Sequence, residues 1–192
     1  MMTESQVITT AFEEIVSAVS TELLDQLQEA NSNIQQVGYL FGHPREMVET
    51  LIQYDQSKTK RDKKYPLVML IEDIPIRRGT QGYYGEAIVR IVIAMSTKAT
   101  LKSAEREAAN YAPILTPIYY ELLRQIDLHS AFVTKGVRGI EHEMLNRKYW
   151  GRENLYGTES NTLSDFVDAI EIRNMRLTVN FEACIPAINS YI

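Results

Sequence analysis

The chain has 192 residues, 45% of them hydrophobic, which is enough to bury one sizeable core and predicts a single domain over residues 1–192. Its net charge of −5 argues against a general nucleic-acid-binding protein, because the domains of such proteins are usually basic. The only cysteine, Cys184, excludes an intrachain disulfide and a cysteine-based zinc site.

Neither a secretory signal nor a membrane span is expected. The amino terminus has no basic region before its apolar residues, and no apolar run approaches the roughly 18 residues that a membrane helix needs. We therefore predict a soluble protein, located in the cytoplasm of the cell that makes it, with no membrane partner.

The amino-terminal part of the chain predicts two helices around a short strand. Thr3–Gln6 fits a capping box, and apolar residues then recur at three- and four-residue steps, which predicts a long amphipathic helix ending near Ala30. Residues 37–41 predict a short strand. A second, shorter helix is expected from Pro44 to about Tyr54, because proline is favoured at the first helical position.

A basic run leads directly into an apolar strand. We predict an exposed loop over residues 55–66, followed by a central strand at Leu67–Ile71, which is apolar on both faces. The loop is interpreted either as solvated or as a contact with an acidic surface or a phosphate backbone. Its candidate interface residues are Lys58, Lys60, Arg61, Lys63 and Lys64.

The middle of the chain predicts an irregular connection, a long strand and a broken helix. The connection holds Pro75, several glycines and the candidate interface residues Arg77 and Arg78. A strand is expected over Glu86–Ser96. The helix that starts at Ser103 should bend or restart at Pro113 and Pro117, with Thr116 capping its second part up to Leu128.

Residues 133–162 predict an exposed excursion, with a hairpin around residues 140–145. It contains a cluster that mixes cations with aromatic rings. The cluster is interpreted as a surface that stacks on single-stranded bases, as an interface anchor, or as a tryptophan that plugs the core. Its residues are Arg147, Lys148, Tyr149, Trp150 and Arg152.

The last long strand, Asp168–Phe181, changes its side-chain parity. Ile170 and Ile172 alternate on even numbers, whereas the apolar residues from Met175 onward are odd. An extra residue is needed for that change, so a bulge is expected at residues 173–174. Residues 182–192 form a tail without a structural signal. Together the elements predict an α+β fold, with a mainly antiparallel sheet and helices packed on one face.

No catalytic constellation is found in the sequence. His142-Glu143 resembles the start of a zinc-protease motif, but position 146 is asparagine where the second metal ligand would stand. The glycines near residue 80 lack the lysine of a phosphate-binding loop. We therefore assign no catalytic, cofactor-binding or metal-binding residues, and expect a protein that is not an enzyme and needs no cofactor.

Two stretches resemble structural proteins of tailed bacteriophages. They are LFGHPREMVETLIQYDQSKTKRDKKYPLVMLIED, with its Gly-His element, polar loop and Tyr-Pro-Leu strand, and the later strand DAIEIRNMRLTVNF. The chain is similar to tail-terminator, tail-completion and neck-ring proteins, including those of crAss-like phages that infect Bacteroidetes. The resemblance implies an amino-terminal helix, a sheet with long strands joined by an extended loop, a helix on one face and a final strand.

The resemblance also implies a structural virion protein at the head–tail junction or in the tail, assembled in the host cytoplasm. Such proteins form homo-oligomeric rings, often of six or twelve subunits, beside portal, neck or tail proteins and around the channel through which packaged DNA leaves. The alternative is a nucleic-acid-binding accessory protein that uses the two basic segments. Salt-dependent DNA binding distinguishes the alternative from the ring protein.

Overall fold

The computed structural model describes residues 2–57, 63–78, 83–150 and 166–182. The amino-terminal half of the chain contains α1 (Glu4–Ala30), β1 (Gly38–Gly42), α2 (Pro44–Asp55), β2 (Leu67–Ile71), β3 (Ile76–Arg78) and β4 (Tyr84–Thr97). The second half contains α4 (Ser103–Arg106), η1 (Glu107–Leu115), α5 (Thr116–Leu128), β5 (Phe132–Val133), η2 (Val137–Gly139), β6 (Glu143–Lys148) and β7 (Phe166–Asn180).

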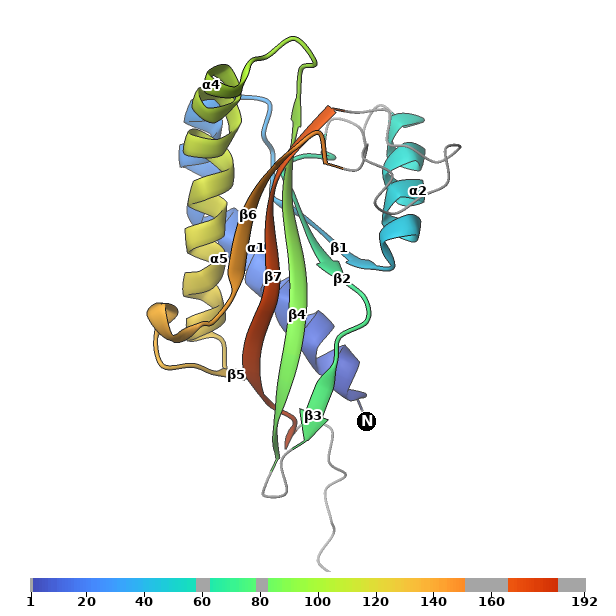
Figure 1. The fold of residues 1–192 in the computed structure, drawn as a ribbon, viewed down its shortest axis with the longest axis vertical. Coiled ribbons are helices and arrows are strands. Elements are labelled where there is room, and N and C mark those ends of the chain that lie inside the picture. Colours follow the sequence, from blue (N-terminus) through green and yellow to red (C-terminus); the bar gives the residue numbers. More distant parts are fainter. Residues whose placement is uncertain (1, 58–62, 79–82, 151–165, 183–192) are drawn as a thin grey trace, which may run out of the picture.

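The strands form one curled sheet in the order β1-β2-β4-β7-β5, with β3 paired to β4 and β6 paired to β7 (Figure 1). β1 and β2 run parallel, and the other described pairs are antiparallel. The predicted α+β class with a mainly antiparallel sheet is therefore confirmed. Within the described part of the chain, no helix combines the length and hydropathy that crossing a bilayer requires.

The predicted amino-terminal helix and its cap are confirmed in α1. The Thr3 amide donates to Gln6 Oε1 at 2.8 Å, and the Gln6 amide donates to Thr3 Oγ1 at 3.2 Å. These reciprocal bonds satisfy two amides that the first turn leaves without helical partners. The apolar stripe of α1, which includes Ile8, Phe12 and Ile15, is buried against the sheet.

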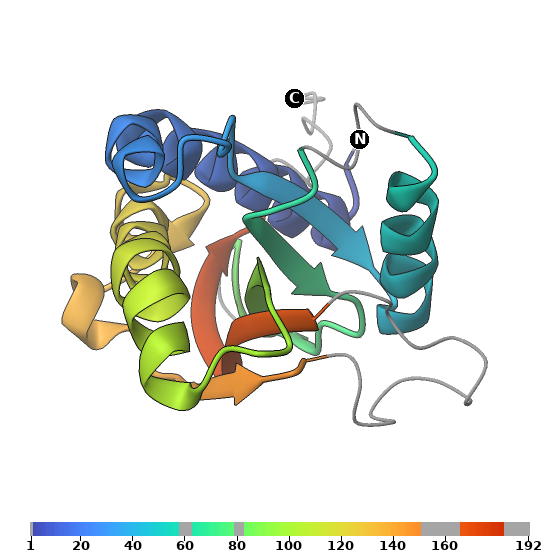
Figure 2. The same cartoon turned by 90° about the horizontal axis from the view of Figure 1, so that it is seen from above.

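Helices cover both faces of the sheet, but unequally. α1, η1 and α5 pack on one face and enclose the main core, which includes Val68 and Leu70 of β2. α2 packs on the other face over a smaller core, to which β2 contributes Leu67, Met69 and Ile71. The expectation that β2 is apolar on both faces is thus confirmed. α2 adds a helix on the face opposite to the two long helical segments (Figure 2).

The prediction that Thr116 caps a second part of the helix that starts at Ser103 is wrong. The segment stays helical from Ser103 to Leu128, and Thr116 has helical dihedrals, with φ −67° and ψ −46°, rather than the extended ones of a cap. The helix widens into a π-helix over Glu107–Leu115, which contains Pro113. A π-helical stretch changes the spacing of the backbone bonds, so a residue without an amide hydrogen is accommodated without breaking the helix.

The predicted bulge in the last strand is confirmed. Val89 of β4 pairs with Met175, and Ile91 pairs with Ile172, so Arg90 alone faces both Arg173 and Asn174. Asn174 has a φ of 53°, in the left-handed region that asparagine tolerates better than most residues. The extra residue lets Ile172 and Met175 both point into the main core.

The hairpin predicted around residues 140–145 is wrong, although most side chains of the described part of the excursion, residues 133–150, are exposed. β5 and β6 both pair with β7, and β6 matches Leu145 to Glu171 across the sheet rather than forming a local hairpin. The sheet edge beside β7 attracts this segment because an unpaired strand edge leaves backbone groups unsatisfied. Residues 151–162 and most of the predicted tail lie outside the described residues.

Candidate interaction surface

One face of the sheet presents five arginines from four strands. We name it the arginine face: Arg77 (β3), Arg90 (β4), Arg147 (β6), and Arg173 and Arg176 (β7). The strand register places the arginines on the same face. Arg77 pairs with Glu86 and Arg176 with Ile88, which stand at alternate positions of β4 with Arg90, and Arg147 pairs with Ala169 of β7. Directly paired residues project to the same face of a sheet. These strands lie in front in Figure 1, with α1 behind them.

A buried carboxylate organises the centre of this face. Glu171 is only 3% exposed and accepts from Arg173 Nη2 at 2.8 Å, from Arg147 Nε at 3.2 Å and from Arg90 Nη2 at 3.4 Å. Burial by itself would raise the pKa of Glu171. The hydrogen bonds and charges of Arg173 and Arg147 outweigh it and hold the pKa below its ordinary value. Glu171 is therefore ionised at neutral pH and fixes three guanidinium groups on rigid strands.

In the outer part of the arginine face, two arginines have no carboxylate partner among the described residues. Arg77 and Arg176 are exposed, and neither makes an ion pair with another residue of the described chain. The same face carries Glu86, Glu143 and Glu171, so its five arginines outnumber its carboxylates. Arg78, by contrast, forms an ion pair with Glu4, and its guanidinium lies 5.8 Å from the centroid of the Phe181 ring.

The outer side of α1 has the opposite charge. Six of the chain's 25 acidic residues precede Arg45, which is its first basic residue, and the remainder has 20 basic and 19 acidic residues. The exposed acids on α1 are Glu13, Glu14, Glu22, Asp25 and Glu29, which we name the acidic helix surface. His129 and Arg124 of neighbouring elements contact Glu14 and Glu22. Within the described chain, Glu13, Asp25 and Glu29 make no ion pair.

The two described candidate residues of the predicted basic loop differ in exposure. Lys63 is exposed, but Lys64 is 2% exposed, so its assignment to an exposed loop is wrong. It directly precedes the buried strand β2, and its ammonium lies 5.5 Å from the centroid of the Tyr65 ring, where a cation–π contact offsets part of the cost of burial. Lys58, Lys60 and Arg61 lie outside the described residues.

The predicted aromatic and basic cluster is divided by the fold. Trp150 is 4% exposed in the core beneath α2, which favours the interpretation as a core plug over an interface anchor. Tyr149 stacks on the buried Arg106, with 4.1 Å between the guanidinium carbon and the ring centroid. Arg147 joins the arginine face, and Lys148 is exposed on the other side of β6. Arg152 lies outside the described residues.

A buried ion pair that sequence analysis missed supports this region. Arg106 is 1% exposed and donates to Asp168 Oδ1 at 2.6 Å, while Asn110 donates to Asp168 Oδ2 at 2.8 Å. Arg106 also donates to the carbonyls of Leu101 and Lys98. The bonds to Asp168 hold the helical segment to β7, and those to Leu101 and Lys98 hold it to the connection that follows β4, so the network is structural.

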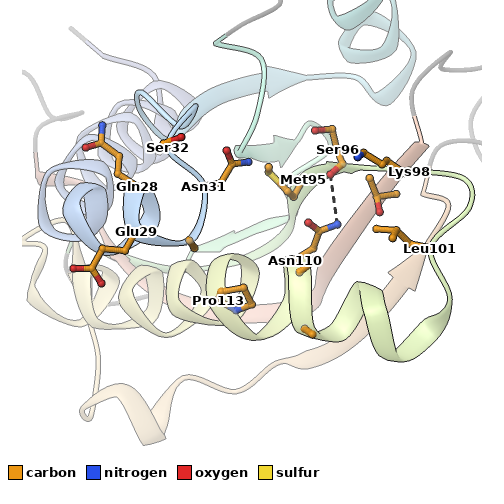
Figure 3. Close-up of a pocket in the computed structure, with 14 residues that line it drawn as sticks. Gln28, Glu29, Asn31, Ser32, Met95, Ser96, Lys98, Leu101, Asn110 and Pro113 are labelled. Carbon is orange, nitrogen blue, oxygen red and sulfur yellow. Dashed lines mark hydrogen bonds between the residues drawn. The ribbon is translucent and has the colours of Figure 1, made fainter.

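A hollow of about 910 Å³ lies beside this network, between the carboxyl end of α1, the end of β4 and η1 (Figure 3). Its charged lining residues are Glu29 and Lys98. Asn110, which points toward Ser96 in this view, already donates to the Ser96 carbonyl at 3.4 Å and to Asp168. The walls of the hollow are partly polar and partly apolar, and the Asn110 amide is engaged in protein contacts.

The histidines serve packing and capping. His43 accepts from the Arg45 amide at the start of α2, and His142 shares a 2.6 Å hydrogen bond with the Tyr119 hydroxyl. In the described residues, no three histidine, cysteine, aspartate or glutamate side chains come together as metal ligands.

Sequence analysis found Arg77 and Arg147 of the arginine face, but missed Arg90, Arg173, Arg176 and Glu171. The available signal was the placement of charged residues on alternate positions of predicted strands, which marks a face that is open to solvent. In comparisons with known proteins, no family model matches the chain and no curated protein sequence matches it significantly.

Proposed function

We propose that this chain is a structural subunit that forms a ring in the head–tail connector or tail of a tailed bacteriophage. The element layout supports the proposal, since the chain has an amino-terminal helix, long strands β4 and β7, helices against the sheet and a strand at the end of the described chain. This is the layout that the resemblance to tail-terminator and neck-ring proteins implies. Portal, neck or tail proteins would be its neighbours, with packaged DNA passing through the ring.

The arginine face is the observation that carries the proposal. It is the exposed part of the sheet face on which α2 also packs. Its central guanidinium groups are held in place by Glu171, and its outer ones, Arg77 and Arg176, are exposed. Arginine is enriched in protein interfaces because its planar group donates several hydrogen bonds with little loss of freedom. A rigid surface of this kind suits assembly, where a stable contact buries about 1,200–2,000 Å² in total.

Mass photometry and negative-stain electron microscopy of the purified full chain test the proposal. The expected result is a closed ring, formed alone or on addition of the portal or neck protein of the same phage. A protein that stays monomeric under both conditions, across micromolar concentrations, contradicts it.

A nucleic-acid-binding accessory protein is the second candidate, and the excess of arginine over carboxylate on the arginine face favours it. Binding to duplex DNA would weaken with salt, by a slope of about 0.9 in log–log terms for each phosphate contact. Fluorescence anisotropy with labelled duplex, repeated for Arg77→Gln/Arg176→Gln, measures that slope. A monomer whose DNA affinity falls in this variant would replace the ring proposal.

A further inference from the structure

We propose that the arginine face of one copy of this chain binds the acidic helix surface of a second copy, in a head-to-tail contact. The inference rests on the proposed function insofar as the chain assembles with itself, and it names the two surfaces that meet. Both surfaces consist of described residues on regular elements.

Charge complementarity identifies the partner. Among the described residues, Arg77 and Arg176 of the arginine face have no ion-pair partner, and neither have Glu13, Asp25 and Glu29 of the acidic helix surface. No basic residue precedes Arg45, so α1 has no cation of its own to neutralise these acids. Complementary potentials accelerate association and disfavour other orientations of the partner.

The chemistry of the arginine face favours carboxylates over phosphates. Glu171 already receives three guanidinium groups at 2.8–3.4 Å, which demonstrates that the strands present arginines in positions suited to a carboxylate. Glu86 and Glu143 stand on the same face and would repel a continuous phosphate backbone, whereas separate carboxylates on a helix can meet the arginines individually.

Geometry makes the contact head-to-tail. The two surfaces lie on opposite sides of the sheet, with α1 along one side and β6 along the other in Figure 2. A two-fold dimer joins identical surfaces, so it would place arginine against arginine or acid against acid. Joining the two different surfaces leaves one free surface at each end, and repetition produces a ring if the rotation closes or a filament if it does not.

Two charge-reversed variants test the pairing. The face variant is Arg77→Glu/Arg176→Glu, and the helix variant is Asp25→Lys/Glu29→Lys. Lysines near the carboxyl end of α1 interact favourably with the helix dipole, so the helix variant should keep its fold. The matched control is Lys135→Glu/Arg138→Glu, which changes the same amount of charge at exposed residues in and beside η2, outside both surfaces.

Each variant alone should lose at least tenfold in the fraction of assembled protein by mass photometry, whereas the control should match the wild-type chain. Mixing the two variants in equal amounts should restore assembly. In the mixture, the glutamates of one variant meet the lysines of the other, and the unchanged arginine and acidic surfaces also meet. Recovery in the mixture shows at the same time that both variants are folded.

The experiment distinguishes a failure of this pairing from a failure of the proposed function. A wild-type chain that assembles and is unaffected by either variant overturns this pairing and leaves the ring proposal in place. Loss of assembly in the face variant alone, with the helix variant unchanged, overturns α1 as the partner. Variants that fail singly and fail when mixed, although circular dichroism shows both folded, also overturn the pairing. A wild-type chain that never assembles overturns the proposed function and this inference together.

Discussion

Glu171 shows at the scale of one residue how a buried charge can organise a surface. Replacing Glu171 by glutamine keeps the shape but leaves Arg90, Arg147 and Arg173 to repel one another, so we expect the free energy of unfolding to fall by about 2 kcal/mol at pH 7. Urea unfolding monitored by circular dichroism measures this change. Glu143→Gln, at an exposed glutamate on the same face, is the control and should cost well under 1 kcal/mol.

The same substitution has a predicted pH dependence. The pKa of Glu171 is lower in the folded protein than in the unfolded chain, where it is about 4.3. Its stabilising contribution is therefore fully present above pH 4.3 and is lost as the pH falls through the lower folded pKa. We expect the difference in stability between wild type and Glu171→Gln to be constant from pH 6 to 8 and to shrink below about pH 4. An undiminished difference at low pH would contradict this account.

The buried pair Arg106–Asp168 provides a second prediction at this scale. Arg106→Met should cost about 3–5 kcal/mol, because it leaves the Asp168 carboxylate buried with Asn110 as its remaining side-chain partner. Arg106→Met/Asp168→Leu should recover part of that loss, since both charges are then removed. Equilibrium unfolding of Arg106→Met, Asp168→Leu and the double variant gives the coupling energy. A double variant no more stable than Arg106→Met would indicate that the packing, rather than the stranded charge, causes the loss.

At the scale of the element, the bulge in β7 sets which side chains of that strand face the core. Asn174 holds a φ of 53°, which β-branched residues strongly disfavour. Asn174→Val should therefore destabilise the protein by about 1–2 kcal/mol, whereas Asn174→Gly should be close to neutral because glycine adopts this conformation freely. Thermal unfolding of both variants checks this. Equal effects would mean that the hydrogen bond from Asn174 to Glu143, which both variants lose, matters more than the backbone.

At the scale of the whole molecule, the proposed contact between charged surfaces should depend on salt. Raising the ionic strength from about 0.1 to 1 M shortens the Debye length from about 10 to 3 Å and screens exposed charges. We expect the oligomer to dissociate over this range in mass photometry, while the fold, held by its two apolar cores, persists in circular dichroism. An oligomer that strengthens with salt would point to an apolar contact elsewhere on the molecule.

The amino-acid sequence by itself determined the elements whose signals are local. The capping box and apolar stripe of α1, the two-sided burial of β2, the presence of strand β4 and the bulge opposite Arg90 follow from periods of 3.6 and 2 in neighbouring residues. The same local signals predicted an interruption at Pro113, where the segment instead stays helical. The helix-breaking propensity of proline does not predict whether the surrounding packing favours a π-helical stretch instead.

Only the tertiary structure decided which distant residues meet. Arg90 and Glu171 are 81 positions apart, and their contact depends on the pairing of β4 with β7, which no local period encodes. The burial of Trp150 and the pairing of β6 with β7 likewise follow from neighbours that are remote in the chain. The spacing of apolar residues along a segment indicates whether it forms a helix or a strand. The exposure and the charged partners of each side chain depend on how these elements pack.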